Sequence, residues 1–93
     1  MNLFDTELDE EVDVLENEEL EKKLIVYNDD FNTFDHVIKC LIDFCGHSPQ
    51  EATKHTLNIH HKGLAIVKEG TTKELQPVKQ ALNENGLTAK IEE

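Results

Sequence analysis

One stretch joins an apolar run to the start of an amphipathic helix: Leu24-Ile25-Val26-Tyr27-Asn28-Asp29-Asp30-Phe31-Asn32-Thr33. Branched aliphatic and aromatic residues favour extended backbone, so residues 24–27 predict a first strand. Asn and Asp carry acceptors close to the backbone and suit turns and helix N-termini. Three in succession exceed what one helix cap needs. The cluster is therefore either a turn with an N-cap or the seat of a small cation with several donors, such as a metal ion or an ammonium group.

Two helices are predicted after this turn. The first has apolar residues at helical spacing, with Asn32 or Thr33 as its N-cap and Gly46 as its stop: Phe34, Val37, Ile38, Leu41 and Cys45. Ser48-Pro49-Gln50-Glu51 begins the second helix, because Ser48 can cap, proline suits the first helical position and Glu51 can close a capping box. This helix is predicted to end at Gly63.

Two further strands and one helix complete the pattern. Residues 64–67 predict a second strand, and Lys68-Glu69-Gly70-Thr71 predicts a turn. A third helix is expected near Thr72. Pro77 is tolerable only in a first turn, which makes Leu75 a lead-in residue and places the continuous helix at about 76–85. Residues 87–91 predict the last strand.

The order of these elements, β-α-α-β-α-β, predicts a small α+β domain. In this domain a three-stranded sheet packs against three helices. Residues 1–22 differ in composition, with ten acidic residues and one lysine. Charge of one sign in a block predicts a flexible acidic arm, either for solubility or for contact with a partner. We therefore expect an arm over residues 1–22 and a single folded domain over residues 23–93.

The composition excludes several functional classes. The formal net charge is -11 and the chain has no arginine, which argues against binding to nucleic acid or to an anionic membrane surface. No apolar run approaches the roughly 20 residues of a membrane span. The first residues have no signal-like core, so we expect a cytoplasmic protein. Cys40 and Cys45 are five residues apart on one helix and are expected to be reduced, partly buried thiols.

Catalytic and metal signatures are also missing from the sequence. His55 and His60 do not have the spacing of a zinc-binding helix pair, and no ligand pairs occur at finger spacing. There is no Gly-rich nucleophile elbow and no phosphate-binding loop. We therefore expect no enzymatic activity, no metal and no cofactor.

Two separated motifs together carry a family resemblance. Asn28-Asp29-Asp30 follows the first strand, while Ala52-Thr53 and Ile59-His60 mark the start and end of the second helix, with Gly63 behind them. Over residues 24–93 this combination resembles the ClpS family, adaptor proteins of bacterial Clp proteases. The resemblance implies the fold of the C-terminal domain of the ribosomal stalk protein L7/L12.

The resemblance also implies a function. Family members bind a large hydrophobic N-terminal residue of a protein (Leu, Phe, Tyr or Trp) and hand that protein to a hexameric AAA+ Clp ATPase, ClpA- or ClpC-like, for degradation. In this chain the α-amino group would be held by Asn28, Asp30 and His60, with Asp29 nearby. The side chain would enter a hydrophobic pocket formed by Asn32, Phe34, Val37, Thr56, Ile59 and Leu87. Glu74 and Lys79 would contribute to docking on the ATPase, and the adaptor is expected to be a monomer.

Position 56 departs from the family pattern, because better-known members carry a larger apolar residue there. Thr56 gives a smaller and more polar wall, which bears on the ranking of N-terminal residues. A second resemblance leads to an alternative function. Val67-Lys68-Glu69-Gly70, followed by a Lys-containing helix and Gly86, is similar to the stalk domain itself, which would make the chain a non-catalytic interaction module. That domain does not carry Asn-Asp-Asp after its first strand, so the adaptor is the preferred interpretation.

Overall fold

The computed structural model describes residues 20–93, and its elements follow the predicted order. All three strands form one antiparallel sheet in the order β2-β1-β3, which confirms the α+β fold. Residues 1–19 of the predicted acidic arm lie outside the described residues, and Lys22 is already the first residue of β1. The elements are β1 (Lys22–Tyr27), α2 (Phe34–Cys45), α3 (Pro49–Lys62), β2 (Leu64–Gly70), α4 (Thr72–Glu84) and β3 (Thr88–Glu92).

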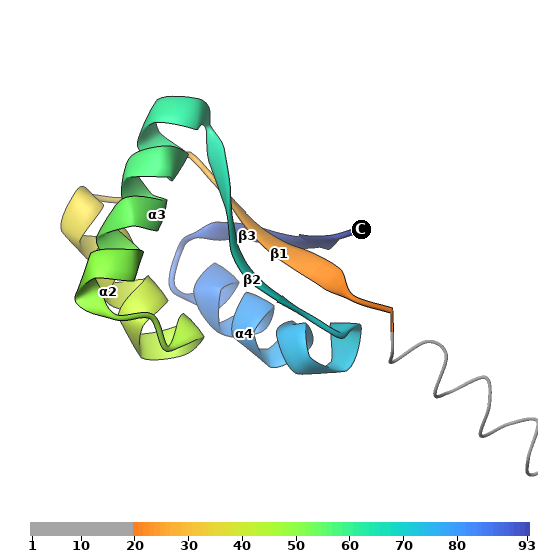
Figure 1. Ribbon diagram of the computed structural model, residues 1–93. Helices are drawn as coiled ribbons and strands as arrows, with labels where there is room; N and C mark the ends of the chain where they lie inside the picture. The colour runs from red at the N-terminus through yellow and green to blue at the C-terminus, as the bar shows by residue number, and fades with distance from the viewer. Residues whose placement is uncertain (1–19) are drawn as a thin grey trace, which may run out of the picture.

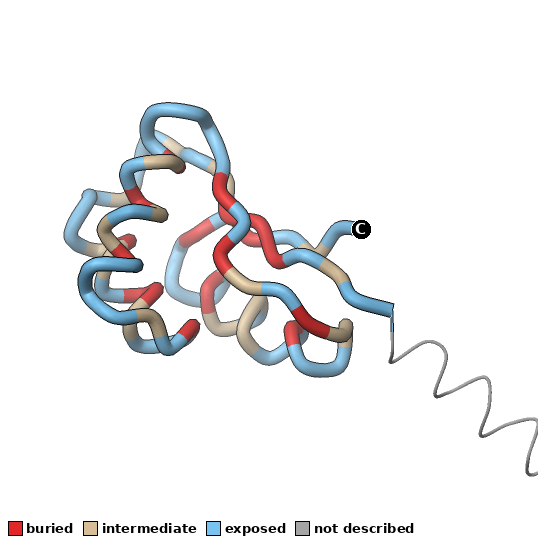
Figure 2. Tube along the Cα trace, in the orientation of Figure 1, coloured by how far each residue is buried: buried red, intermediate tan, exposed pale blue. Residues whose placement is uncertain are grey.

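The helices pack against the sheet and against one another (Figure 1). Helix α4 contacts all three strands, α3 contacts β2, and α2 contacts both of the other helices. In the central strand β1, Leu24 and Val26 belong to the core that the helices cover, with 0% and 1% of their surface exposed. Leu41 of α2 and Leu82 of α4 are equally buried, so the core lies between the sheet and the helices (Figure 2).

The predicted ends of α2 and α3 are confirmed. Thr33, rather than Asn32, caps α2 and accepts a hydrogen bond from the His36 backbone N–H at 3.1 Å. Ser48 and Glu51 form the expected capping box at the start of α3. Gly63 ends α3 with φ of 92°, a left-handed conformation that suits glycine.

Strand β2 is longer than predicted, because Lys68–Gly70 is extended rather than a turn. These residues pair with Lys22–Leu24 of β1, and the register shifts between Leu24 and Ile25. The local sequence, with its glycine, suggested a turn. Backbone hydrogen bonds to the neighbouring strand keep the segment extended instead.

Helix α4 begins four residues earlier than the predicted continuous helix, at Thr72, and contains Pro77. Interior proline costs a helix about 3 kcal/mol. Two features offset this cost: a capping box between Thr71 and Glu74 and complete burial of Leu75. A cap contributes about 1 kcal/mol and a buried leucine about 1.5–3 kcal/mol. Leu75 is therefore a core residue and not a lead-in.

Both cysteines are free and buried, as predicted. Burial raises the pKa of the Cys45 thiol to about 11, although nearby Lys68 opposes the shift. Burial also raises the pKa of Cys40. Within residues 20–93, no helix is long and apolar enough to cross a bilayer.

The thiols are therefore expected to resist alkylation. A thiol with a raised pKa has little reactive thiolate at pH 8, and burial also blocks access of the reagent. Iodoacetamide at pH 8 should leave the native protein unmodified over a time in which the same protein in denaturant reacts at both positions, as measured by intact mass. Rapid modification of the native protein would show that these side chains are accessible.

Candidate functional site

The pairing of β1 with β2 brings two distant segments together. Tyr27, the last residue of β1, pairs with Leu64, the first residue of β2. The next residue along the chain, Asn28, donates its backbone N–H to the carbonyl oxygen of Gly63 at 2.9 Å. Because Gly63 directly follows α3, the polar loop after β1 lies beside the last turn of that helix.

A pocket of about 300 Å³ opens at this junction. An engineered apolar cavity of about 150 Å³ already takes up benzene, so this volume is sufficient for an aromatic side chain with a polar group beside it. The lining residues come from the β1–α2 loop, from α2 and from α3: Asn28, Asp29, Asp30, Asn32, Phe34, Val37, Thr56, Ile59 and His60.

One side of the pocket is apolar. Val37 and Ile59 are 9% and 4% exposed and belong to the hydrophobic core, so this wall is held by close packing. Phe34 is 39% exposed, and its ring and the His60 ring form a T-shaped pair with 6.1 Å between centroids. An apolar side chain could therefore be buried between α2 and α3.

Thr56 presents a less polar wall than its residue type suggested. The side chain is 2% exposed, and its hydroxyl donates a hydrogen bond to the Ala52 carbonyl at 2.7 Å. This bond satisfies the only donor of the hydroxyl within α3. Thr56 therefore makes the pocket wider than a larger residue would, without adding a free donor.

Asp29 is committed to the structure of its own loop. Its Oδ1 accepts hydrogen bonds from the backbone N–H groups of Phe31 at 2.8 Å and Asn32 at 2.9 Å, and its Oδ2 accepts from Asn32 Nδ2 at 2.8 Å. Partial burial raises the pKa of this carboxyl, but the three hydrogen bonds outweigh it and hold the pKa below its ordinary value. Asp29 therefore stays ionised at neutral pH and shapes the loop.

The other predicted amine-binding side chains remain available. Within residues 20–93, the side chains of Asn28, Asp30 and His60 make no hydrogen bond to the protein. They offer an amide oxygen, a carboxylate and an imidazole nitrogen among the residues that line the pocket. These three acceptors match an ammonium group with three N–H donors. No group of three or more metal-ligating side chains occurs among the described residues.

The side chains of Asn32 and His36 connect this loop to the α4–β3 turn, and His36 was not among the predicted site residues. Asn32 Nδ2 donates to the Gly86 carbonyl at 2.8 Å, and His36 Nε2 lies 2.8 Å from the Asn85 carbonyl. Because a carbonyl can only accept, His36 carries a proton on Nε2. The one available signal was spacing, since Asn32 and His36 lie one helical turn apart.

Leu87 is the one predicted pocket residue that does not line the pocket. It is 5% exposed and belongs to the hydrophobic core, and its backbone N–H donates to Leu82 at 3.0 Å. Leu87 therefore contributes to the core that also holds Val37 and Ile59, and not to the lining of the pocket itself.

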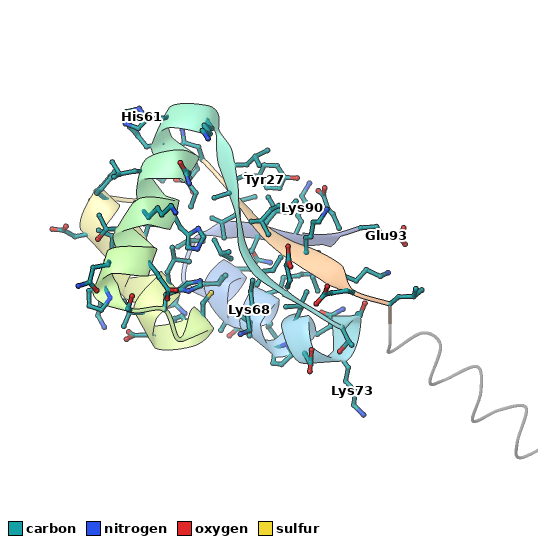
Figure 3. All side chains as sticks on the ribbon, viewed as in Figure 1. Tyr27, His61, Lys68, Lys73, Lys90 and Glu93 are labelled. Atoms are coloured by element: carbon teal, nitrogen blue, oxygen red, sulfur yellow. The ribbon has the colours of Figure 1, made fainter. Side chains whose placement is uncertain are left out.

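The two predicted docking residues, Glu74 and Lys79, lie on α4, away from the pocket. Glu74 takes part in the capping box, and Lys79 lines a separate depression of about 500 Å³ beside Lys22 and Lys90. Lys90 lies over the Tyr27 ring, with its Nζ 5.7 Å from the ring centroid (Figure 3). His61, in the last turn of α3, is labelled in the same view.

Comparison with known proteins agrees with the two sequence motifs. The family model of the ATP-dependent Clp protease adaptor protein ClpS matches residues 17–90. A ClpS adapter protein of Streptomyces avermitilis is 35% identical over 88 residues, covering 95% of this chain and 84% of the relative. The adapter of Synechocystis sp. is 43% identical over 67 residues, covering 71% of this chain and 68% of the relative.

A solved structure has the same fold. Agrobacterium tumefaciens ClpS2 bound to L-phenylalaninamide matches with a TM-score of 0.66 and 19% identity, over 77% of this chain and 94% of that one. Together with the family match over residues 17–90, these relatives show that the chain belongs to the ClpS family of ATP-dependent Clp protease adaptor proteins.

Proposed function

We propose that this protein binds the N-terminal residue of other proteins when that residue is large and hydrophobic, and delivers them to a ClpA- or ClpC-like AAA+ ATPase. One observation carries the proposal: three acceptors without a hydrogen bond within residues 20–93 line the same pocket as the apolar side chains of Val37 and Ile59. A protein N-terminus has the complementary pair of groups, an α-ammonium and, beside it, a side chain. The adaptor acts without catalysis, and we propose that it works as a monomer.

The amine is the polar half of this recognition. Asn28, Asp30 and His60 accept its three N–H groups, and ionised Asp29 adds negative charge without contact. The ligand in the Agrobacterium tumefaciens structure, L-phenylalaninamide, has a free α-amino group beside an aromatic side chain. A pocket of about 300 Å³ can take Leu, Phe, Tyr or Trp, with the side chain against Val37 and Ile59.

Delivery requires surfaces separate from the pocket. Helix α4, with Glu74 and Lys79, is a docking surface for the ATPase that leaves the pocket open. The block of acidic charge over residues 1–22 is a second element for this contact.

The test compares two fluorescent peptides by anisotropy, one beginning with free Phe and one with the same sequence and an acetylated N-terminus. Acetylation removes the charge and donors of the amine and keeps the side chain. The free peptide alone should bind. Equal binding of both, or of neither, would leave the Asn-Asp-Asp turn as a helix cap and favour the stalk-like interaction module.

Binding should also depend on pH through the peptide itself. An α-amino group titrates near roughly 7.7–8.0, and only its charged form has three donors. Affinity is therefore expected to fall about tenfold for each pH unit above about 8. Anisotropy titrations between pH 7 and pH 10 measure this, with circular dichroism confirming that the fold persists. An affinity that stays constant to pH 10 would contradict an ammonium contact.

A further inference from the structure

Asn32 is connected to two segments at once, and both connections use the same nitrogen. Its Nδ2 lies 2.8 Å from Asp29 Oδ2 and 2.8 Å from the Gly86 carbonyl. Both partners are acceptors without protons, so both N–H groups of the amide donate, which also defines the orientation of the amide. Asn32 therefore bridges the loop that carries the acceptors and the turn between α4 and β3.

The bridge acts on a loop that has few other supports. The Asn28 side chain and the Asp30 side chain make no hydrogen bond within residues 20–93, and Phe31 is 92% exposed. Within the loop, the Asp29 carboxylate accepts hydrogen bonds from the backbone. The Asn28–Gly63 backbone hydrogen bond attaches one end of the loop to the rest of the protein, and the Asn32–Gly86 hydrogen bond attaches the other end. His36 supports the second attachment, because it contacts the carbonyl of Asn85, next to Gly86.

We propose that Asn32 is a positioning residue of the amine site, rather than only part of the pocket wall. This inference rests on the proposed function. Asn32 holds ionised Asp29 in place, and Asp29 holds the backbone of Phe31 and Asn32. Asp30 lies between Asp29 and Phe31 inside this hydrogen-bonded turn, so the hydrogen bonds of Asn32 fix the direction of the Asp30 carboxylate. Small misalignment of a charged acceptor weakens a charge-assisted hydrogen bond steeply.

The chain offers a matched control at the other side of the same turn. Asn83 donates through Nδ2 to the Ala89 carbonyl at 3.2 Å and accepts from the Ala89 N–H at 2.8 Å. Its side chain therefore connects α4 to β3 with the same amide chemistry, and within residues 20–93 it makes no hydrogen bond to the loop of residues 28–32. Asn83→Ala weakens the turn, whereas Asn32→Ala also releases the loop.

The experiment measures the affinities of both variants for peptides beginning with free Leu, Phe or Tyr. Asn32→Ala is expected to weaken binding of all three by a similar factor, about tenfold, the size expected when hydrogen bonds to a charged group are lost. Asn83→Ala should bind as the unchanged protein does. If Asn32 is only a wall, the ranking of the three peptides will change instead. Equal weakening in both variants would indicate a general structural role, and either result overturns the proposal.

A second measurement uses the protein without substitutions, and it tests the proposal even if the Asn32→Ala variant fails to fold. The Asn32 side chain amide protons, both hydrogen-bonded, should exchange with solvent several-fold more slowly by NMR than those of Asn58, whose side chain makes no hydrogen bond within residues 20–93. Exchange as fast as that of Asn58 would show that the bridge is absent. If the unchanged protein binds none of the peptides, the proposed function is wrong. If the unchanged protein and Asn32→Ala bind the peptides equally well, the proposed function stands and the positioning role of Asn32 is wrong.

Discussion

Replacement of Asp30 by asparagine is expected to weaken binding of a peptide with a free N-terminal Phe by about 10- to 150-fold, or roughly 1.5–3 kcal/mol. Asparagine keeps the shape of the side chain and one oxygen acceptor, but it removes the negative charge that faces the ammonium. Asp30 lines the pocket and makes no hydrogen bond elsewhere within residues 20–93, so the fold does not depend on its charge. Isothermal titration calorimetry or fluorescence anisotropy measures the change directly.

Asp35→Asn provides the matched control for this variant. Asp35 is an exposed acidic residue in the first turn of α2, five positions from Asp30, and it does not line the pocket. Both variants lose one negative charge, so a long-range attraction between the acidic protein and the peptide would be reduced equally in both. We expect only Asp30→Asn to lose affinity. Equal losses of affinity in both variants would mean that long-range electrostatic attraction, and not direct contact with Asp30, accounts for the effect.

Replacement of Leu24 by alanine is expected to lower the free energy of unfolding by about 2–5 kcal/mol. Leu24 lies in the central strand and is fully buried among residues of the helices, so truncation leaves a cavity that the sheet cannot close. A small domain has only about 5–15 kcal/mol of stability. The melting temperature should therefore fall by roughly 10 °C or more, as measured by circular dichroism.

The control for this variant is Leu64→Ala, the same chemical change in the neighbouring strand. Leu64 is 42% exposed at the start of β2, so less apolar surface is lost and no closed cavity forms. The expected loss is below about 1 kcal/mol. A Leu24→Ala variant no less stable than Leu64→Ala would mean that the core is not centred on β1.

The helix boundaries with strong local signals could be predicted from the sequence. Capping by Ser48 and termination at Gly63 depend on groups within four residues of each other, and these contacts form wherever the rest of the chain lies. A helix start near Thr72 was expected, but the continuous run of α4 from Thr72 through Pro77 was not predictable in this way. Pro77 lies inside this helix, and the capping box between Thr71 and Glu74 together with the burial of Leu75 offsets the cost of that proline.

The candidate site shows the same division between local and long-range information. Asn28, Asp30 and His60 were identifiable as chemical groups, because a cluster of short polar residues and a histidine at a helix end are visible in the sequence. Their meeting in one pocket depends on the pairing of Tyr27 with Leu64 across the sheet. No local pattern encodes that register, since it results from the hydrogen bonds of two strands that are far apart in the chain.

The residue types of the site and the order of the elements were therefore determined by the amino-acid sequence alone. The residue types are read directly from the sequence, and the order of the elements follows from patterns among neighbours along the chain. The tertiary structure decided how those residues are used. Adjacent aspartates became different, with Asp29 bound within its loop and Asp30 left open, and Leu87 joined the core instead of the pocket. These outcomes depend on which donors and apolar surfaces approach from distant segments, such as Gly86 meeting Asn32, and only the folded chain specifies that approach.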